Sequence, residues 1–184
     1  MNQRQAKNNV YGLLADSRSV MMSGAVLFAL LTALGSFVRL PLPFSPVPVT
    51  LQTFFVLLSG ALLGKKCGFL SQVLFVSLGI AGIPVFAVSG GIFGPTGGYL
   101  SAFLVIPILC RLLIDRTSGS FISLSVIFFF CSVIILASGS LYLSFYMNVS
   151  LPKAFSLGFL PFIIGDFLKS LSAAGIVSLT LKKG

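Results

Sequence analysis

The stretch that decides the fold is Cys67–Cys110, CGFLSQVLFVSLGIAGIPVFAVSGGIFGPTGGYLSAFLVIPILC, which contains no charged side chain. As a single helix it would be far longer than the roughly 20 residues that cross a bilayer. The chain must therefore turn within it. The turn signals are Ser89–Gly91 and Gly94–Gly98, because glycine and proline interrupt regular helices. We predict two membrane-spanning helices here, residues 68–88 and 98–113.

Charged residues and prolines divide the rest of the chain in the same way. One apolar span lies between Arg18 and Arg39, and prolines at 41, 43, 46 and 48 predict a loop over residues 40–49. The predicted spans are residues 19–38, 50–64, 68–88, 98–113, 121–146 and 161–181. We therefore expect an all-α integral membrane protein with six transmembrane helices. Residues 1–184 would form one membrane domain, with residues 1–18 as a cytoplasmic segment.

The composition indicates a membrane protein rather than a soluble one. Hydrophobic residues make up 57% of the 184 residues, and charged residues only 8%. A soluble domain carries about 25% charged residues, so this chain has too few to cover a water-facing surface. The net charge of +9 does not indicate nucleic acid, because the basic residues stand singly or in pairs beside apolar stretches. We expect the lipid bilayer as a partner and no nucleic acid.

Lysine and arginine are distributed unevenly between the two ends of the predicted spans. With the N-terminus in the cytoplasm, nine of the 12 basic residues lie on the inner side, two on the outer side and one within the membrane. The inner residues are Arg4, Lys7, Arg18, Lys65, Lys66, Arg111, Arg116, Lys182 and Lys183, and the outer residues are Arg39 and Lys153. Cytoplasmic loops favour basic residues. Both termini are therefore expected in the cytoplasm, and the protein in the cytoplasmic (inner) membrane with several crossings.

The charges predicted within the membrane are both in Gly165–Lys169, GDFLK. Asp166 and Lys169 are three residues apart and share one helix face. Because burying charges in hydrocarbon is costly, such residues usually face the bundle interior and are functional. The topology places them in the outer half of the sixth span, where a site would meet a ligand from outside. The alternative is a structural ion pair that locks two helices.

The glycine-rich turn is a second candidate for ligand contact. Five of the nine residues in Gly90–Gly98 are glycine. Glycine permits positive φ and close approach of a ligand to the backbone, and irregular backbone at membrane depth is tolerated where it lines a cavity. The predicted topology puts this turn on the same side as Asp166. An ordinary turn between two helices is the alternative.

Two further patterns allow both a functional and a structural interpretation. Gln52 and Thr53 begin the second span after the proline-rich loop, and their side chains either hydrogen-bond a ligand or cap the helix. Ala25, Ala29 and Ala33 repeat every four residues on the first span. Small residues at this spacing permit close helix approach. This stripe either docks another membrane protein or packs within the bundle.

Nothing in the chain indicates catalysis. An intramembrane enzyme needs a nucleophile with a base, or paired carboxylates. This chain has no histidine and one predicted intramembrane acid. Its three cysteines, Cys67, Cys110 and Cys131, lack the spacing of metal ligands. We expect a protein that is not an enzyme and that holds neither a metal nor a cofactor.

Three motifs, in this order, resemble the BioY family. They are PVPVTLQT at Pro46–Thr53, GPTGGY at Gly94–Tyr99 and GDFLK at Gly165–Lys169. The resemblance extends from about Ser23 to Leu181. BioY proteins are the biotin-specific S components of energy-coupling-factor (ECF) transporters. The resemblance implies an S-component-like bundle of six helices that holds one biotin near the external surface and serves its uptake.

The resemblance also implies a set of site residues. Asp166 would accept a hydrogen bond from a ureido N–H, and Lys169 would donate to the ureido oxygen or the carboxylate. Tyr99 would pack on the bicyclic ring and also hydrogen-bond. The glycine-rich turn would supply backbone N–H groups, and Phe86 and Phe93 would form apolar walls. The predicted substrate-binding residues are Asp166, Lys169, Tyr99, Gly94, Thr96, Gly97, Gly98, Ser89, Phe86, Phe93, Gln52 and Thr53.

The resemblance further implies partners. The alanine stripe would meet a transmembrane coupling protein, whose module would also include two ATPase subunits. A further polar or cationic side chain would be expected early in the fourth helix, but Leu100–Phe103 offers none suited to the biotin carboxylate. Lys169, Arg39 and solvent are the candidates. The alternative functions are an S component for another vitamin and a structural membrane subunit without a ligand.

Overall fold

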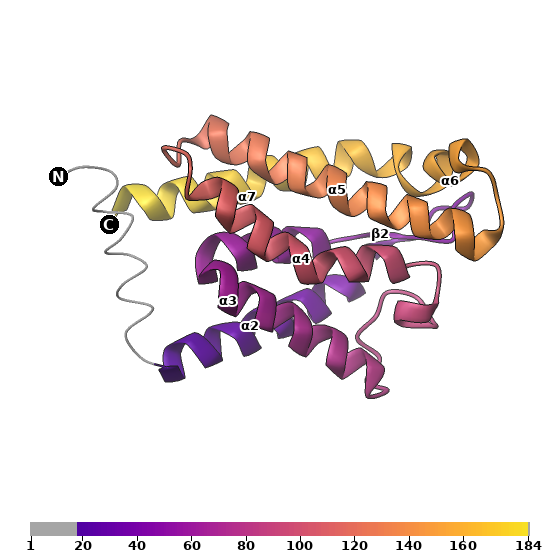
Figure 1. The fold of residues 1–184 in the computed structure, drawn as a ribbon, viewed down its shortest axis with the longest axis horizontal. Helices are drawn as coiled ribbons and strands as arrows, with labels where there is room; N and C mark the ends of the chain where they lie inside the picture. Colours follow the sequence, from indigo (N-terminus) through magenta and orange to yellow (C-terminus); the bar gives the residue numbers. More distant parts are fainter. Residues whose placement is uncertain (1–17, 184) are drawn as a thin grey trace.

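The computed structural model describes residues 18–183 as an elongated bundle of helices (Figure 1). The long helices are α2 (Arg18–Phe37), α3 (Gln52–Ile80), α4 (Gly97–Ile114), α5 (Phe121–Met147) and α7 (Ile163–Lys183). The short elements are β1 (Arg39–Leu40), β2 (Val49–Thr50), η1 (Gly91–Phe93), α6 (Leu151–Gly158) and η2 (Leu160–Phe162). The predicted cytoplasmic segment 1–18 lies outside the described residues except for Arg18, where α2 begins.

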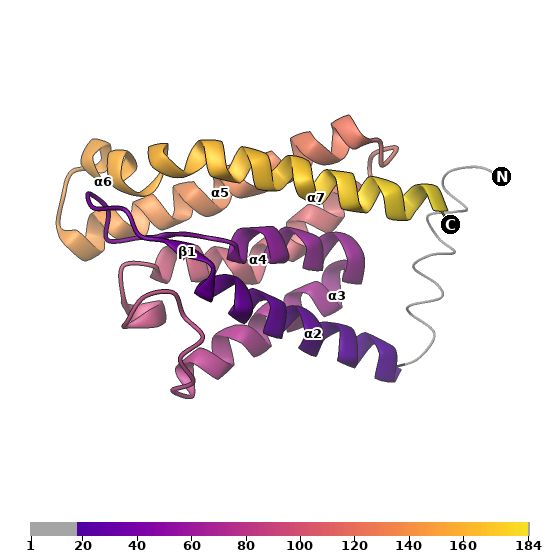
Figure 2. The same cartoon turned by 180° about the vertical axis from the view of Figure 1, so that it is seen from behind.

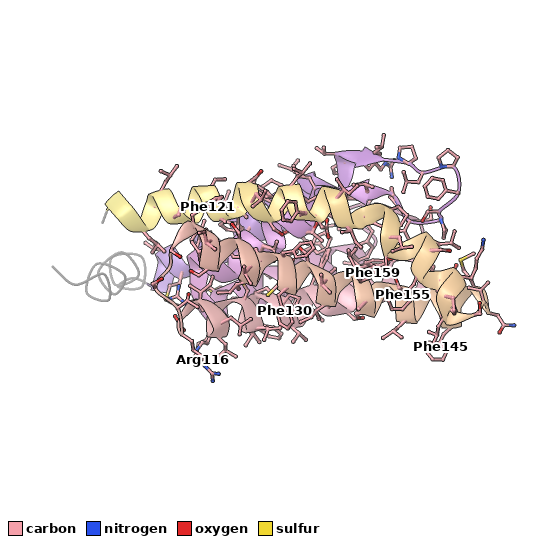
Figure 3. The ribbon with its side chains drawn as sticks, turned by 90° about the horizontal axis from the view of Figure 1, so that it is seen from above. Arg116, Phe121, Phe130, Phe145, Phe155 and Phe159 are labelled. Atoms are coloured by element: carbon pink, nitrogen blue, oxygen red, sulfur yellow. The ribbon has the colours of Figure 1, made fainter. Side chains whose placement is uncertain are left out.

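Within the described part of the chain, five helical stretches are long and apolar enough to cross a membrane. They are Val20–Phe37, Gln52–Ile80, Gly97–Ile114, Phe121–Met147 and Leu151–Leu181. Their outward surfaces are apolar: on α5, for example, Phe121, Phe130 and Phe145 project from the bundle (Figure 3) and are 46%, 50% and 83% exposed. Water opposes extended apolar surface of this kind, whereas lipid does not. The chain is therefore a multi-pass membrane protein.

α3 is a hairpin of two helical segments rather than one straight helix. Gly64 has φ 80° and ψ −177°, a conformation open essentially to glycine alone. Gln72 Nε2 donates to Ser59 Oγ at 3.4 Å although the two residues are 13 apart in sequence. On a straight helix this separation would be about 20 Å. The chain reverses at Gly64, as the purple ribbon shows from behind (Figure 2).

The second segment of α3 ends earlier than the predicted span 68–88. The helix stops at Ile80, because Gly82 adopts φ 91° and Pro84 has no N–H to continue the hydrogen-bond ladder. The segment from Ala81 to the start of α4 is irregular apart from the single turn η1. The other predicted spans agree with α2, α4, α5 and α7 to within two residues at each end.

Two regular elements occupy places where none was predicted. The predicted loop 40–49 is closed at its base by an antiparallel pairing of Arg39 with Thr50 and of Leu40 with Val49. The helix α6 precedes α7, and Pro152 fits its first turn because that turn needs no N–H donor there. The β1–β2 ribbon and α6 lie at the end of the bundle opposite the C-terminal end of α7 (Figure 1).

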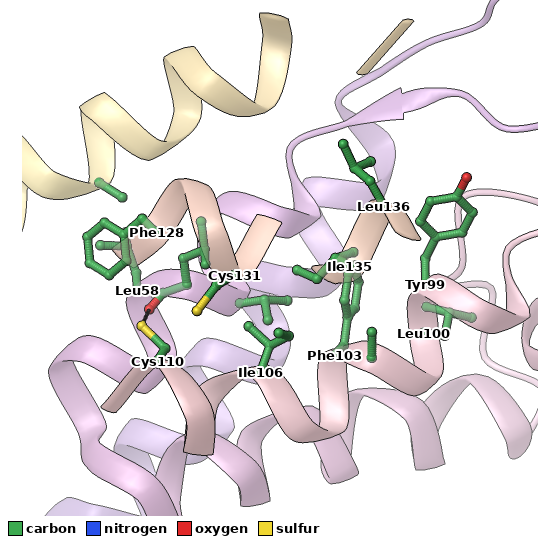
Figure 4. Packing of buried hydrophobic residues seen from close by; sticks show 14 of the residues in the cluster. Leu58, Tyr99, Leu100, Phe103, Ile106, Cys110, Phe128, Cys131, Ile135 and Leu136 are labelled. Atoms are coloured by element: carbon green, nitrogen blue, oxygen red, sulfur yellow. Dashed lines mark hydrogen bonds between the residues drawn. The ribbon is translucent and has the colours of Figure 1, made fainter. Parts of the chain in front are cut away.

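The core is tightest where α4 packs against α5. A Cβ atom on Gly98 would lie 2.6 Å from the Ser138 carbonyl oxygen, and one on Gly139 would overlap the Tyr99 ring. Only glycine therefore fits at either position in so dense an interior. Deeper in the bundle the two helices interdigitate through Phe103, Ile106, Cys110, Cys131 and Ile135 (Figure 4). This close packing fixes the position of the Tyr99 ring.

Candidate ligand-binding site

A cavity opens where the N-terminal ends of α3, α4 and α7 meet. The space around it amounts to about 490 Å³, a figure that includes open solvent at its mouth. Its lining residues are Val47, Pro48, Thr50, Gln52, Thr53, Ala87, Thr96, Tyr99, Leu100, Phe103, Leu136, Phe162, Asp166 and Lys169. The positive ends of three helix dipoles point toward it, which favours a negative charge there.

Asp166 is the buried acid of this cavity. It lies in the first turn of α7 and is only 1% exposed. Its Oδ1 accepts hydrogen bonds from Lys169 Nζ at 2.6 Å and from Thr53 Oγ1 at 3.3 Å. Lys169 Nζ also donates to Thr53 Oγ1 at 3.1 Å. The three side chains tie the first turn of α3 to the first turn of α7 and hold the carboxylate against the cavity.

Two residues of the cavity lining each have a buried polar atom without a hydrogen-bond partner among the described residues: Asp166 Oδ2 and Gln52 Nε2. Gln52 is 4% exposed, and its Oε1 accepts from Thr50 Oγ1 at 3.3 Å. A buried polar group without a partner costs about 1–3 kcal/mol, and a charged one costs more. Such groups are rare unless something else satisfies them. The cavity thus offers one acceptor and one donor to a ligand that carries the complementary pair.

The capping interpretation of Gln52 and Thr53 is wrong. The cap position of α3 is Leu51, whose side chain makes no capping hydrogen bond, and the first N–H of the helix, that of Gln52, meets the Thr50 hydroxyl at 3.4 Å. The Thr53 hydroxyl contacts Asp166 and Lys169 instead, and Gln52 lines the cavity. The first turn of α3 therefore contributes its polar side chains to the cavity.

The other walls are mainly apolar. Phe103 and Leu136 come from α4 and α5, and Phe162 comes from η2. Tyr99 also lines the cavity, but its hydroxyl donates to the Gly158 carbonyl oxygen at 2.7 Å. That hydroxyl holds the end of α6 against α4, so it is the Tyr99 ring that is available to a ligand. Thr96 lines the cavity as well, with its hydroxyl turned to the Gly91 carbonyl oxygen.

Six predicted residues do not line this cavity: Ser89, Gly94, Gly97, Gly98, Phe86 and Phe93. The Phe86 ring fills the space between Gly79 and Gly91 and meets Phe75 edge to face, with ring centroids 5.6 Å apart. Phe93 points outward and is 81% exposed. Neither ring is a wall of the cavity. Phe86 instead anchors the irregular segment after α3 to the helix itself.

The glycines of the turn serve close packing. Cβ atoms on Gly97 and Gly98 would overlap Tyr142 of α5, and one on Gly94 would lie 2.7 Å from the Ser89 carbonyl oxygen. Of the residues predicted in this turn, only Thr96 lines the cavity. The interpretation as a turn that packs against a neighbouring helix therefore describes most of this segment. Its backbone is not the main wall of the site.

The alanine stripe of α2 also faces inward. Ala25, Ala29 and Ala33 are 0%, 2% and 6% exposed. On the same side of the helix, the Thr32 hydroxyl accepts from Gln72 Nε2 of α3 at 3.3 Å. The small side chains allow α2 to lie close to the α3 hairpin. In this structure the stripe packs inside the bundle, and its contact with a partner stays a prediction.

Several lining residues carry no signal in the sequence. Leu136 belongs to α5, which is apolar almost throughout, and nothing in its neighbourhood distinguishes it from residues that face lipid. Phe162 follows Pro161 in a short 3₁₀ turn. Hydrocarbon and protein interior are similarly apolar, so the pattern of residues does not separate the two faces of such a helix.

Comparison with known proteins agrees with the resemblance found in the motifs. A model of the BioY family matches residues 5–183. The biotin transporter BioY of Thermotoga maritima is 41% identical, over 86% of this chain and 94% of that protein. The probable biotin transporter BioY of Pyrococcus horikoshii is 40% identical, over 83% of this chain and 90% of that protein.

A solved structure shows the same fold. It is the crystal structure of the S-component for biotin from an ECF-type ABC transporter. It is 28% identical in sequence, covers 89% of this chain and 92% of its own, and superimposes with a TM-score of 0.79. The likeness in sequence and in fold extends over nearly the whole chain, and this chain belongs to the BioY family.

Proposed function

We propose that this protein binds biotin in the cavity beside Asp166 and serves in biotin uptake as the S component of an ECF transporter. The observation that carries the proposal is the pair of unpartnered buried atoms, Asp166 Oδ2 and Gln52 Nε2. The ureido group of biotin has N–H donors and a carbonyl acceptor, which are the complements of these two atoms. Charge-assisted hydrogen bonds in a dry site are stronger than neutral ones in water.

The remaining lining suits the rest of the bicyclic ring. Phe103, Leu136 and Phe162 supply apolar surface for the thioether ring, and the Tyr99 face is available for packing. Lys169 has three N–H donors, and two of them go to Asp166 and Thr53. In this proposal Lys169 chiefly balances the charge of Asp166, with one N–H left for the ligand.

We infer six crossings, with the α3 hairpin counted as two. The reversal at Gly64 supports this count, as do Lys65 and Lys66 beside it, since basic residues gather on the cytoplasmic side. Residues 1–184 then form one membrane domain in the cytoplasmic membrane, with both termini inside and the cavity on the outer side. A membrane-impermeant thiol reagent tests this: in intact cells it should label Phe93→Cys and not Lys66→Cys. Both side chains are exposed in the structure.

The partners belong to the same proposal. A coupling protein and two ATPase subunits would supply the energy for transport, because the sequence carries no nucleotide-binding motif of its own. The alanine stripe is buried, so we do not assign it to the coupling protein in this conformation. Co-purification from native membranes tests the partnership. Recovery of the chain alone, under conditions that preserve known membrane complexes, would speak against it.

A binding assay on the purified protein in detergent tests the function. We expect biotin to bind below micromolar concentration and to be displaced by unlabelled biotin alone among the water-soluble vitamins. Displacement by a different vitamin would favour an S component of other specificity. Absence of binding to any of them would favour a structural subunit. In that case Asp166 and Lys169 would be only a structural ion pair. Exchanging the two residues would then preserve both the fold and the function of the protein.

A further inference from the structure

A second cavity adjoins the first at Ala87, which lines both. It contains about 900 Å³ of space and is open to the outside. The end of α3 and the irregular segment that leads to α4, including Phe86 and Phe93, form most of its lining. A ligand that fills the first cavity and extends past Ala87 would enter this second space.

Arg39 is built into the boundary between the two cavities. Its backbone pairs with Thr50 in the β1–β2 ribbon, and Thr50 lines the first cavity. Its side chain lines the second cavity, and Nη1 donates to the Ala87 carbonyl oxygen at 2.6 Å. Its backbone is therefore held beside a lining residue of the first cavity, and its side chain is held at Ala87, the residue that the two linings share.

Arg39 is the cationic side chain placed to meet a ligand carboxylate near Ala87. Among residues 20–181, whose side chains the structure describes, only Arg39 and Lys169 are cationic residues that line either cavity. Lys169 donates to Asp166 and Thr53, so its remaining N–H lies beside the atoms proposed to bind the ring and not at Ala87. A guanidinium has five N–H donors in a planar fork that matches a carboxylate. One N–H of Arg39 goes to Ala87, which orients the fork without exhausting it.

We propose that Arg39 binds the carboxylate at the end of the ligand's aliphatic side chain, where that chain leaves the first cavity past Ala87. The inference rests on the proposed function, since it takes the ligand to be biotin with its ureido ring at Asp166. It divides recognition between two ends of the molecule. Asp166 and Gln52 hydrogen-bond the ureido ring, and Arg39 binds the carboxylate of the side chain.

The test compares biotin with biotinamide, in which an uncharged carboxamide replaces the carboxylate. Both affinities are measured by calorimetry on the purified wild-type protein and on the Arg39→Gln variant. We expect the wild type to prefer biotin by at least about tenfold, the range of one charge-assisted hydrogen bond near a surface. Arg39→Gln should weaken biotin by the same factor and leave biotinamide within about twofold, so that the preference disappears.

Matched variants separate binding from folding. Lys153→Gln removes the other outer cation, which lies on α6 and lines neither cavity, and it should leave the preference intact. Arg39→Lys keeps the charge and should retain part of the preference. Equal weakening of both ligands by Arg39→Gln would show that Arg39 only supports Ala87, and would overturn the inference. An unchanged preference would do so too, while tight biotin binding by the wild type would leave the proposed function standing.

Discussion

Lys169 Nζ lies 2.6 Å from Asp166 Oδ1, while Asp166 Oδ2 is buried at the cavity with no partner among the described residues. One oxygen of the carboxylate is therefore used by the fold, and the other is left for a ligand. The structural and functional interpretations of this pair are compatible, because they concern different atoms. Substitutions that affect one oxygen or the other should separate the two roles.

Asp166→Asn should weaken biotin binding by roughly 10- to 150-fold, the value of a hydrogen bond to a charged group. Asparagine keeps the shape of the side chain and removes the charge that the ureido N–H would meet. Calorimetry on the purified protein measures the change. Asp115→Asn is the matched control: that acid pairs with Arg111 at 2.8 Å and Lys65 at 3.5 Å and lies outside the cavity lining. An Asp166→Asn protein with wild-type affinity would remove Asp166 from the site.

Lys169→Met should lower the free energy of unfolding by about 3–5 kcal/mol, because it leaves a buried carboxylate without its counter-charge. The side chains of Lys169 and Asp166 are only 13% and 2% exposed, so solvent cannot compensate. The double variant Asp166→Asn/Lys169→Met should recover most of the stability and still bind biotin poorly. Thermal unfolding in detergent and calorimetry report the two effects. If single and double variants unfold at the same temperature, the pair does not stabilise the fold.

Gln52→Leu should weaken biotin about tenfold with little loss of stability. The substitution removes a donor for the ligand and at the same time removes a buried N–H that has no partner in the fold. Gln72→Leu is the opposite case, because Gln72 Nε2 donates to Thr32, Ser59 and Ser71, none of which lines the cavity. It should destabilise the protein by about 1–3 kcal/mol and spare the affinity of the folded fraction. If Gln52→Leu mainly lowered stability and Gln72→Leu mainly lowered the affinity for biotin, both proposed roles would be refuted.

Gly139→Ala should destabilise the protein by about 1–3 kcal/mol and weaken biotin, because the added methyl group would overlap the Tyr99 ring. Gly175→Ala is the control. That glycine lies within α7 with no atom inside 4 Å of the added carbon, so alanine should stabilise the helix by up to about 1 kcal/mol. The unfolding temperature should therefore fall for Gly139→Ala and rise slightly for Gly175→Ala, and only Gly139→Ala should weaken biotin binding. Equal behaviour would mean that Tyr99 is not held by α5.

Much of the candidate site follows from local spacing. Asp166 and Lys169 share a face because they are three residues apart on a helix, and their ion pair is present in the structure. Gln52 and Thr53 were predicted from their place after the proline-rich loop, and both line the cavity. Of the residues predicted from the glycine-rich turn, only Thr96 lines the cavity. A glycine in the sequence indicates a close contact at that position, but it does not indicate whether a ligand or a neighbouring helix makes the contact.

The sequence by itself determined the membrane class, most helix bounds and the chemical character of the site. These depend on hydrophobic length, proline and glycine positions, and charges that cannot lie in lipid. Tertiary structure decided which faces turn inward. It buried the stripe at Ala25 in the core, set Phe86 between two glycines, and brought Thr53 within 3.3 Å of Asp166 across 113 residues. The physical reason is that lipid and core are equally apolar, so only contacts between helices distinguish the two sides of an apolar helix.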